Sequence, residues 1–365
     1  MSRRVVIAPD SFKGTTTAAE AAEALARGWR SVAPDDELVL KPMADGGEGT
    51  LDAFEASVAG AVRVPVTVKG PDDRPVDAAW LRLPDGGALV ELALTSGITL
   101  LDPLRPFDAH TIGFGQAIAA ALDGGANRVL LAIGGSSSTD GGAGALAALG
   151  GRFLDADGWP VPAGNRGLGA IVRVDLSGLR ERPAGGAAIL SDVTNPLFGP
   201  FGAAAIFGPQ KGATPDEVEP LERNLGRLVR AMPDRAAFAD AAGAGAAGGT
   251  GFGLLVWGAH MAGGAAAVAD AIGLAEALDG ASLVITGEGR FDGQSAAGKV
   301  PSEVAARADA AGVRVALVAG AIDADASAFA ASASLTDLAG GGAAAMADPL
   351  RWLEAAGAEL ARPAS

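Results

Sequence analysis

Residues 3–10 of the chain read RRVVIAPD, and this stretch decides the fold. The β-branched run before the Pro-Asp pair predicts a short buried strand. A capping box follows, because Thr17 precedes Glu20 by three residues, and apolar side chains then repeat at helical spacing up to residue 32. A second extended run covers residues 37–43. This strand–helix–strand opening predicts a parallel sheet whose strands carry ligand groups at their carboxyl ends.

The same order of strand, glycine-rich loop and helix returns twice along the chain. Residues 128–133 lead into the loop 134–142, and residues 282–286 lead into the loop 287–298. Extended runs separated by turn sequences over residues 62–94 predict antiparallel strands instead. We therefore predict an α/β protein in which at least one domain has a mainly parallel sheet.

The length predicts two domains, since 365 residues exceed the ~150 residues that one domain usually holds. Both ends of the chain alternate strand and helix, which suggests that they share one domain. We predict a discontinuous parallel α/β domain made of residues 1–62 plus 285–365. Residues 63–284 then form an inserted α/β domain with some antiparallel strands.

The composition is that of a packed globular protein with many loops. Hydrophobic residues make up 49% of the chain and charged residues 19%. Glycine accounts for 54 of 365 residues, about 15%, against ~7% in average usage. The formal net charge of −15 argues against a general binder of nucleic acid or of anionic membranes. An anionic substrate would therefore have to meet local positive charge.

Residue counts exclude several kinds of site. The absence of cysteine excludes disulfides, thiolate metal sites and cysteine nucleophiles, and two histidines leave little for a zinc site. Residues 241–269 carry no formal charge, but their many glycines and alanines favour loops and closely packed helices over a membrane span. We expect a soluble cytoplasmic protein that binds neither nucleic acid nor membrane.

The placement of lysine gives the sharpest signal for an anion site. Only five of the 28 basic residues are lysines, and each of them neighbours a glycine or a proline. Lysine is a point charge on a flexible stem and can follow a phosphoryl group. Lys13, Lys211 and Lys299 are therefore candidate phosphate ligands; the alternative is that lysines and loops are both simply exposed.

Residues 293–300 read GQSAAGKV and come close to a phosphate-binding loop of the form G-x-x-x-x-G-K-[ST]. Val300 stands where the motif needs a hydroxyl that binds Mg²⁺, so we reject a true phosphate-binding loop of this type. We predict the weaker arrangement, in which backbone amides and Lys299 face an anion at the start of a helix.

Acidic residues embedded in glycine are the complementary signal. Mg²⁺ prefers oxygen ligands and usually takes one or two carboxylates together with phosphate oxygens and water. Asp192 follows another predicted strand, where a base, a metal ligand and a turn-stabilising aspartate are all open interpretations. The acidic clusters are Asp45-Gly46-Gly47-Glu48-Gly49, Asp140-Gly141-Gly142 and Glu288-Gly289-Arg290-Phe291-Asp292-Gly293.

Seven motifs in order along the chain resemble those of the bacterial type I glycerate kinase family. The resemblance implies two α/β domains that face a cleft, and phosphorylation of D-glycerate with ATP and Mg²⁺, usually at the 2-hydroxyl. The motifs are APDSFKG (residues 8–14), PMADGGEGT (42–50), GGS with DGG (134–136, 140–142), SDV with NPL (191–193, 195–197), FGPQKGAT (207–214), GAGAAGG (243–249), and TGEGR through DGQ to GK (286–299).

The resemblance and the residues together give a candidate site for in-line phosphoryl transfer. The three candidate lysines would meet phosphates and the substrate carboxylate, with Arg290 as a possible bidentate clamp. Asp192 is the predicted base that deprotonates the substrate. Mg²⁺ binding and deprotonation would be divided among five carboxylates, namely Asp45, Glu48, Asp192, Glu288 and Asp292. The predicted catalytic residues are Lys13, Asp45, Asp192 and Lys211; the substrate- or nucleotide-binding residues are Ser11, Gly46, Gly47, Ser136, Asn195, Gln210, Arg290 and Lys299; the metal ligands are Glu48, Glu288 and Asp292.

Two positions depart from the pattern of the family. Thr139 stands where the family usually has asparagine, and Gln116 stands where it usually has glutamate. These departures leave two alternatives open. One is a kinase for another small hydroxy acid, and the other is a non-catalytic sensor of a nucleotide or metabolite.

Overall fold

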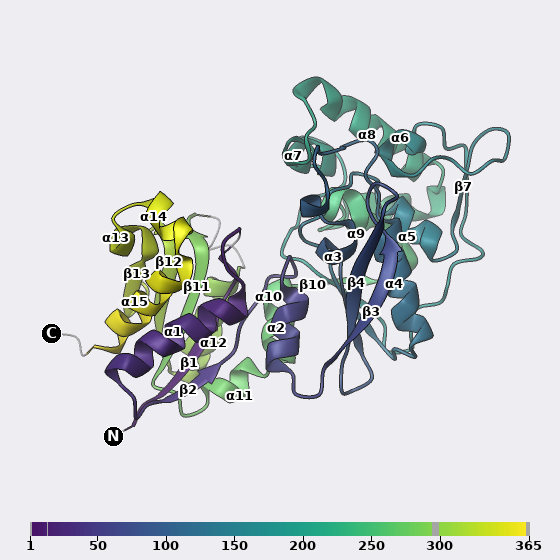
Figure 1. Cartoon of the computed structure of the whole chain (residues 1–365). Helices are drawn as coiled ribbons and strands as arrows, with labels where there is room; N and C mark the ends of the chain where they lie inside the picture. Colours follow the sequence, from purple (N-terminus) through teal and green to yellow (C-terminus); the bar gives the residue numbers. More distant parts are fainter. Residues whose placement is uncertain (1, 13, 294–298, 363–365) are drawn as a thin grey trace. The chain divides into compact units, whose positions relative to one another are not determined.

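The computed structural model describes residues 2–12, 14–293 and 299–362, which fold into two compact α/β units (Figure 1). Unit 1 comprises residues 1–45, 52–59 and 263–365, and unit 2 comprises residues 46–51 and 60–262. The prediction of an α/β fold is confirmed. The chain passes from unit 1 to unit 2 between Asp45 and Gly46, within one of the acidic clusters.

The described part of unit 1 contains a five-stranded sheet with the strand order β13-β12-β11-β1-β2. Every neighbouring pair of these strands runs parallel. The predicted strand–helix–strand opening is therefore confirmed. The strands are β1 (Arg4–Pro9), β2 (Glu37–Leu40), β11 (Leu283–Phe291), β12 (Arg314–Ile322) and β13 (Ala331–Ser334).

Two boundaries in this sheet differ from the prediction. The second strand was predicted over residues 37–43, but β2 ends at Leu40. Residues 287–291 were predicted to belong to a loop, but they continue β11. The reason is that β12 is equally long and stays paired with β11 as far as Phe291 and Ile322.

Helices flank the sheet of unit 1. Val5 and Ile7 pack with Leu25 and Leu353 in one apolar cluster, so α1 and α15 cover one face, as Figure 1 also shows. Val6 alternates with them and faces the other side, where α12 contacts the strands. The helices of unit 1 are α1 (Ala18–Val32), α10 (Gly264–Ala271), α11 (Leu274–Leu278), α12 (Val300–Ala311), α13 (Leu335–Ala339), α14 (Gly342–Ala347) and α15 (Pro349–Ala361); α2 (Thr50–Ser57) spans the boundary between the units.

The described part of unit 2 contains a six-stranded sheet with the order β10-β9-β6-β5-β4-β3. The first four strands in this order run parallel, whereas β4 pairs antiparallel with both β5 and β3. The antiparallel strands predicted over residues 62–94 are thereby confirmed. The strands are β3 (Val62–Lys69), β4 (Pro75–Arg82), β5 (Ala88–Glu91), β6 (Val129–Ala132), β9 (Ala187–Leu190) and β10 (His260–Ala262), and a separate hairpin joins β7 (Arg152–Leu154) to β8 (Arg173–Asp175).

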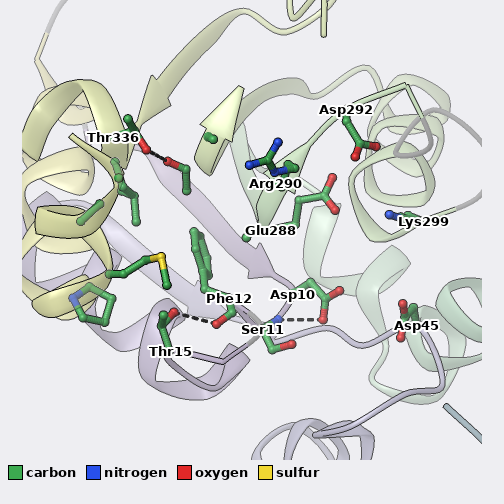
Figure 2. A pocket seen from close by; sticks show the side chains of 18 residues that line it. Asp10, Ser11, Phe12, Thr15, Asp45, Glu288, Arg290, Asp292, Lys299 and Thr336 are labelled. Atoms are coloured by element: carbon green, nitrogen blue, oxygen red, sulfur yellow. Dashed lines mark hydrogen bonds between the residues drawn. The ribbon is translucent and has the colours of Figure 1, made fainter. Parts of the chain in front are cut away.

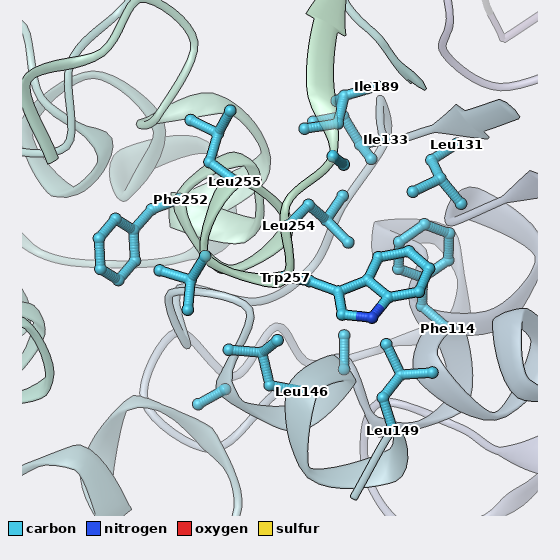
Figure 3. Close-up of a cluster of buried hydrophobic side chains, with 14 of the residues drawn as sticks. Phe114, Leu131, Ile133, Leu146, Leu149, Ile189, Phe252, Leu254, Leu255 and Trp257 are labelled. Atoms are coloured by element: carbon cyan, nitrogen blue, oxygen red, sulfur yellow. The ribbon is translucent and has the colours of Figure 1, made fainter. Parts of the chain in front are cut away.

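The core of unit 2 forms between this sheet and its helices (Figure 3). Phe252 and Trp257 of α9 pack in one cluster with Leu131 of β6 and Ile189 of β9. The Trp257 indole N–H donates to the carbonyl oxygen of Arg180 at 2.8 Å, so its polar atom is satisfied. The α-helices of unit 2 are α3 (Ala93–Ser96), α4 (Ile112–Asp123), α5 (Ala143–Ala148), α6 (Gly164–Leu168), α7 (Ala203–Phe207), α8 (Pro215–Arg230) and α9 (Ala246–Trp257, interrupted by positive φ angles at residues 247–249), and the 3₁₀ helices are η1 (Ile98–Leu100), η2 (Pro209–Lys211) and η3 (Pro233–Asp240).

The uncharged stretch 241–269 divides into α9, β10 and most of α10. Within the described residues, no helix combines the length and the apolar character that crossing a membrane would require.

The second boundary between the units lies earlier than residue 285, where we predicted it. Unit 1 resumes at Gly263, because α10 and α11 pack against α12 of that unit. The Lys41 ammonium at the end of β2 also donates to the carbonyl oxygen of Ile272, between α10 and α11, at 2.6 Å. This contact fixes the segment to the sheet of unit 1.

In the strand–helix–strand opening, two charged residues contact a buried tryptophan. We call Arg3, Trp29 and Asp36 the Trp29 clamp. Trp29 of α1 is fully buried, and its indole N–H donates to Asp36 at 3.0 Å. The Arg3 guanidinium lies 4.8 Å from the Trp29 ring centroid and pairs with Asp36 at 2.8 Å. Burial raises the pKa of the Asp36 carboxyl, but the hydrogen bonds from Arg3 and Trp29 outweigh it and hold that pKa below its usual value.

We expect Asp36→Asn to lower the melting temperature at pH 7, because the amide loses the charge that Arg3 pairs with. Since the folded pKa of Asp36 is depressed, the ionised carboxylate stabilises the fold above the unfolded pKa of ~3.9, and this contribution is lost as the pH falls further. Thermal unfolding at pH 7 and pH 3 should show the difference between variant and wild type shrinking at pH 3. Asp35→Asn, at the exposed neighbouring position, is the control. Equal differences at both pH values would contradict the clamp.

Candidate functional site

Unit 1 contains a pocket of about 400 Å³ where its central strands end. Pro9 of β1 lies opposite Gly287 of β11, so Asp10 and Glu288 are the next residues along two adjacent strands. The Asp10 N–H donates to the Gly287 carbonyl oxygen at 2.8 Å, which extends the pairing by one residue. Asp10 and Glu288 line the pocket and are only 6% and 7% exposed, so two nearly buried carboxyl groups lie at this edge of the sheet.

Charged side chains gather on one side of this pocket. Figure 2 shows Glu288, Arg290, Asp292, Lys299 and Asp45 there, with Phe12, Thr15 and Thr336 on the other side. A guanidinium and an ammonium among carboxylates form a site that can hold an anion and its counter-cation together.

The backbone positions the two cations of the pocket. Arg290 lies on β11 and pairs with Asp323, just beyond β12, at 2.6 Å. Lys299 is the N-cap residue of the 12-residue helix α12. The start of such a helix favours anions, because its first N–H groups lack partners within the helix.

Several predicted site residues meet in this pocket. Ser11, Asp45, Glu288, Arg290, Asp292 and Lys299 all line it. Lys13, a predicted catalytic residue, lies outside the described residues, and so do residues 294–298 of the predicted anion-binding loop.

The oxygen donors of the pocket fit a magnesium ion that is bound jointly with phosphate. Across the described ranges, no group of three or more histidine or acidic side chains forms a metal cage of its own. Mg²⁺ does not need one, since one or two carboxylates with phosphate oxygens and water complete its octahedron. Of the predicted metal ligands, Glu288 and Asp292 line the pocket, whereas Glu48 is exposed in unit 2.

In unit 2, glycine-rich loops meet at the ends of β6 and β9. Gly46 has a φ of +87°, and a Cβ there would collide with the carbonyl oxygen of Leu190 at the end of β9. Its own carbonyl oxygen accepts the N–H of Gly134, just after β6, at 3.0 Å. Only glycine satisfies both contacts at this position. The predicted residues Gly46 and Gly47 therefore lie against the ends of two parallel strands.

A carboxylate that the sequence analysis missed fixes the same loop from β5. Glu91 is 1% exposed and accepts the backbone N–H groups of Gly49 at 3.1 Å and Leu51 at 2.8 Å. The signal that could have found it is an acidic residue at the end of the apolar strand ALVE. Glu91 thus holds the loop from which α2 begins.

Lys211 is buried inside unit 2 and contacts protein groups. Its side chain is 1% exposed, and its ammonium donates to the Ser136 hydroxyl at 2.7 Å and to the Ser138 carbonyl oxygen at 2.5 Å. Burial lowers the pKa of Lys211 to about 7, against the attraction of the Asp140 carboxylate. A Cβ on Gly248, whose φ is +66°, would collide with the Ser138 carbonyl and lie 2.8 Å from the ammonium. Lys211 therefore stabilises the loop 134–142 through two hydrogen bonds.

The Asp140 carboxylate likewise forms its hydrogen bonds with other groups of the protein. Its buried carboxylate accepts from the Thr111 N–H at 2.9 Å, the Thr111 hydroxyl at 2.8 Å, the Gly142 N–H at 3.1 Å and the Gly144 N–H at 3.2 Å. Both carboxylate oxygens are engaged, so Asp140 stabilises the start of α5 and is not placed to bind a metal.

The remaining predicted residues of unit 2 lie in loops that follow its strands. Asp192 is half-buried after β9. The Asn195 amide donates to the Phe201 carbonyl oxygen at 2.8 Å, which closes the next loop, and the Asn195 carbonyl accepts the N–H of Gly245 at 2.9 Å. Gln210 is exposed on η2. The structure thus gives Asn195 a loop-forming contact, places Asp192 half-buried after β9, and leaves Gln210 exposed.

The comparisons with known proteins agree with one another. The sequence profile of the glycerate kinase family matches residues 5–365. A glycerate kinase of Bacillus subtilis (strain 168) is 42% identical over 89% of this chain and 87% of its own length, and a glycerate 2-kinase of Escherichia coli (strain K12) is 41% identical over 83% and 81%.

The chain belongs to the glycerate kinase family. It is therefore a phosphotransferase of the kinase class. A crystal structure described as a glycerate kinase 2 from Salmonella typhimurium LT2 superposes with a TM-score of 0.85 at 38% identity, covering 99% of this chain and 98% of that one. The resemblance inferred from the seven motifs is confirmed.

Both departures from the family pattern lie in unit 2. The Gln116 side-chain carbonyl accepts the Lys69 N–H at 2.7 Å, a contact that a glutamate could make equally well. Thr139 is fully buried, and its backbone carbonyl accepts the Asn165 amide at 2.8 Å. The structure thus gives both residues contacts within unit 2, and neither lines the pocket of unit 1.

The burial of Lys211 predicts a pH-dependent stability. Because burial depresses the folded pKa of Lys211 to about 7, the unfolded chain binds more protons between that pH and ~10.4, and the free energy of unfolding rises with pH there. We expect wild type to gain up to ~1.4 kcal/mol per pH unit relative to Lys211→Met between pH 7 and 9. Urea unfolding at pH 7, 8 and 9 measures this, with Lys299→Met as the control. Parallel profiles for wild type and Lys211→Met would show that the ammonium is not buried as described.

Glu91→Gln should destabilise unit 2 by ~1–3 kcal/mol, because an amide nitrogen would face a backbone N–H where a carboxylate oxygen now accepts it. The free energy of unfolding in urea measures the loss. Glu219→Gln, at a side chain that is 85% exposed, should change it by less than ~0.5 kcal/mol. Similar losses in the two variants would argue against the role of Glu91 in fixing the loop.

Proposed function

We propose that this chain transfers the γ-phosphoryl group of Mg·ATP to D-glycerate, at the 2-hydroxyl, and so produces 2-phosphoglycerate. The observation that carries the proposal is the pocket of unit 1, which Lys299 and Arg290 line together with the four carboxylates of Asp10, Asp45, Glu288 and Asp292. Membership of the glycerate kinase family supports glycerate as the acceptor. The relative named glycerate 2-kinase supports the 2-position.

The reaction needs little covalent chemistry from the protein. In phosphoryl transfer, catalysis consists mainly of positioning and of stabilising the charge on the transferring group. Lys299 and Arg290 would bind phosphate oxygens, and the Arg290–Asp323 ion pair would orient the guanidinium. The first N–H groups of α12 add further positive potential at the same wall. Lys13, in the motif that follows β1, is proposed to join them.

A bound Mg²⁺ would neutralise phosphate charge and hold the donor in line with the acceptor. The carboxylates that could hold it in unit 1 are Asp10, Asp45, Glu288 and Asp292. Glu48, three residues after Asp45 in the same acidic motif, is a further proposed ligand.

Unit 2 would supply the groups that orient and deprotonate the acceptor. Asp192 is the proposed base, because it is a half-buried carboxylate that follows a parallel strand. Ser136, held by the Lys211 ammonium at 2.7 Å, is proposed to bind the acceptor, with Lys211 acting through it. Gly46, Gly47, Asn195 and Gln210 would complete the loops around these groups.

The reaction can be tested by coupled ATP consumption with a panel of small hydroxy acids, followed by phosphorus NMR of the product. We expect turnover with D-glycerate and a phosphorus nucleus coupled to the proton on C2. Turnover with another acid but not with D-glycerate would show that this other acid is the substrate. No turnover with any acid would favour a sensor.

Lys299→Ala should lower turnover by ~10²–10³-fold, because it removes a hydrogen-bond donor that stabilises the charge on the transferring phosphoryl group. Lys69→Ala is the matched control, because Lys69 is an exposed hairpin lysine paired with Asp73 at 2.8 Å, and it should leave turnover unchanged. If the Lys299 variant kept wild-type turnover, its proposed role would fail.

A further inference from the structure

The pocket of unit 1 has a second wall that is apolar, and binding of phosphate does not account for an apolar wall. Phe12, Leu335, Ala345, Met346 and Pro349 line it together with the charged residues. In Figure 2, Phe12 and Thr336 lie away from Glu288, Arg290 and Lys299. The pocket therefore combines a charged side with an apolar side.

Hydrogen bonds fix this apolar side in place before any ligand binds. The Thr336 hydroxyl at the start of α13 donates to the Gly320 carbonyl oxygen of β12 at 2.7 Å (Figure 2). The Phe12 carbonyl oxygen accepts the Thr15 hydroxyl at 2.7 Å and the Thr15 N–H at 2.9 Å. A wall held in this way loses little conformational entropy on binding, which favours affinity.

Met346 is the one member of the wall that leaves a large apolar surface uncovered. It lies on α14 and is 68% exposed, whereas Leu335 and Ala345 are 2% and 5% exposed. A methionine side chain is flexible and polarizable, and it packs well against the face or edge of an aromatic ring. A flat aromatic group in the pocket would cover Met346 and rest against the buried part of the wall.

The two substrates of the proposed reaction differ in their need for such a wall. Glycerate has three carbons, all of which carry oxygen, so it offers no apolar face. A nucleoside triphosphate has an aromatic base at one end and a chain of phosphates at the other. A pocket of about 400 Å³ is within the range of ~300–1,000 Å³ that small-molecule sites usually have.

We propose that unit 1 holds the nucleotide, with its base against Phe12, Leu335 and Met346 and its phosphates toward Lys299 and Arg290. This assignment rests on the proposed function only for the identity of the phosphoryl donor. It makes the C-terminal helices α13 and α14 part of the binding site. It also predicts that binding of the base and binding of the phosphates can be weakened separately.

The test compares two probes that share phosphates but not a base. Calorimetry measures the Kd of Mg·ADP and of Mg·tripolyphosphate for wild type, Met346→Ala, Lys299→Ala and Leu350→Ala. We expect Met346→Ala to raise the Kd of ADP by about tenfold, through the loss of buried apolar contact, and that of tripolyphosphate by less than about twofold. Lys299→Ala should raise both. Leu350→Ala is the matched control, a 37% exposed side chain of the neighbouring helix that does not line the pocket, and it should change neither.

Three results would overturn the assignment. They are an unchanged ADP affinity in Met346→Ala, an equal loss for both probes in that variant, and no binding of Mg·ADP to wild type. Binding is measured without glycerate, so the two proposals can fail separately. A protein that shows the expected binding pattern but does not phosphorylate glycerate would contradict the proposed function alone.

Discussion

The parallel pairing of β1 with β11 is the constraint on which the pocket of unit 1 depends. Its register sets Pro9 opposite Gly287, and the hydrogen bond from the Asp10 N–H to the Gly287 carbonyl oxygen carries the pairing past the end of β1. The carboxyl groups of Asp10 and Glu288 are thereby brought to one edge of the sheet. A slip of one residue would turn each side chain to the opposite face. The charges of the pocket therefore follow from strand register.

The loops of unit 2 are held in place by buried charged side chains that form hydrogen bonds with other groups of the protein. The main ones are the Lys211 ammonium and the carboxylates of Glu91 and Asp140. Glycines such as Gly46 and Gly248 permit the close approach that these contacts need. The abundance of glycine in the composition thus has a local cause in this unit. A buried charge of this kind is costly unless it is paired, so the loops and their charges depend on one another.

The sequence predicted the parts of the structure that depend on local patterns. The capping box at Thr17 and Glu20, the opening strands and the antiparallel strands after Val62 are all present. It also identified most of the charged pocket residues, because each of them lies in a short motif. The interaction of Lys211 with its own protein could not be predicted, since the direction of a side chain depends on packing between loops distant in sequence.

Two further features had no local signal. The strand β11 extends to Phe291 only because β12 is there to pair with it. The wall formed by Leu335 and Met346 carries no motif, because apolar and small residues in short helices have the same pattern as ordinary core. Tertiary contacts decide both cases.

The most direct test of the account is a crystal structure of the protein with Mg²⁺ and a non-hydrolysable ATP analogue. We expect the base to lie against Phe12 and Met346, and the phosphates to lie beside Lys299 and Arg290. A nucleotide whose base lay away from that wall, or which bound only to the loops of unit 2, would contradict it.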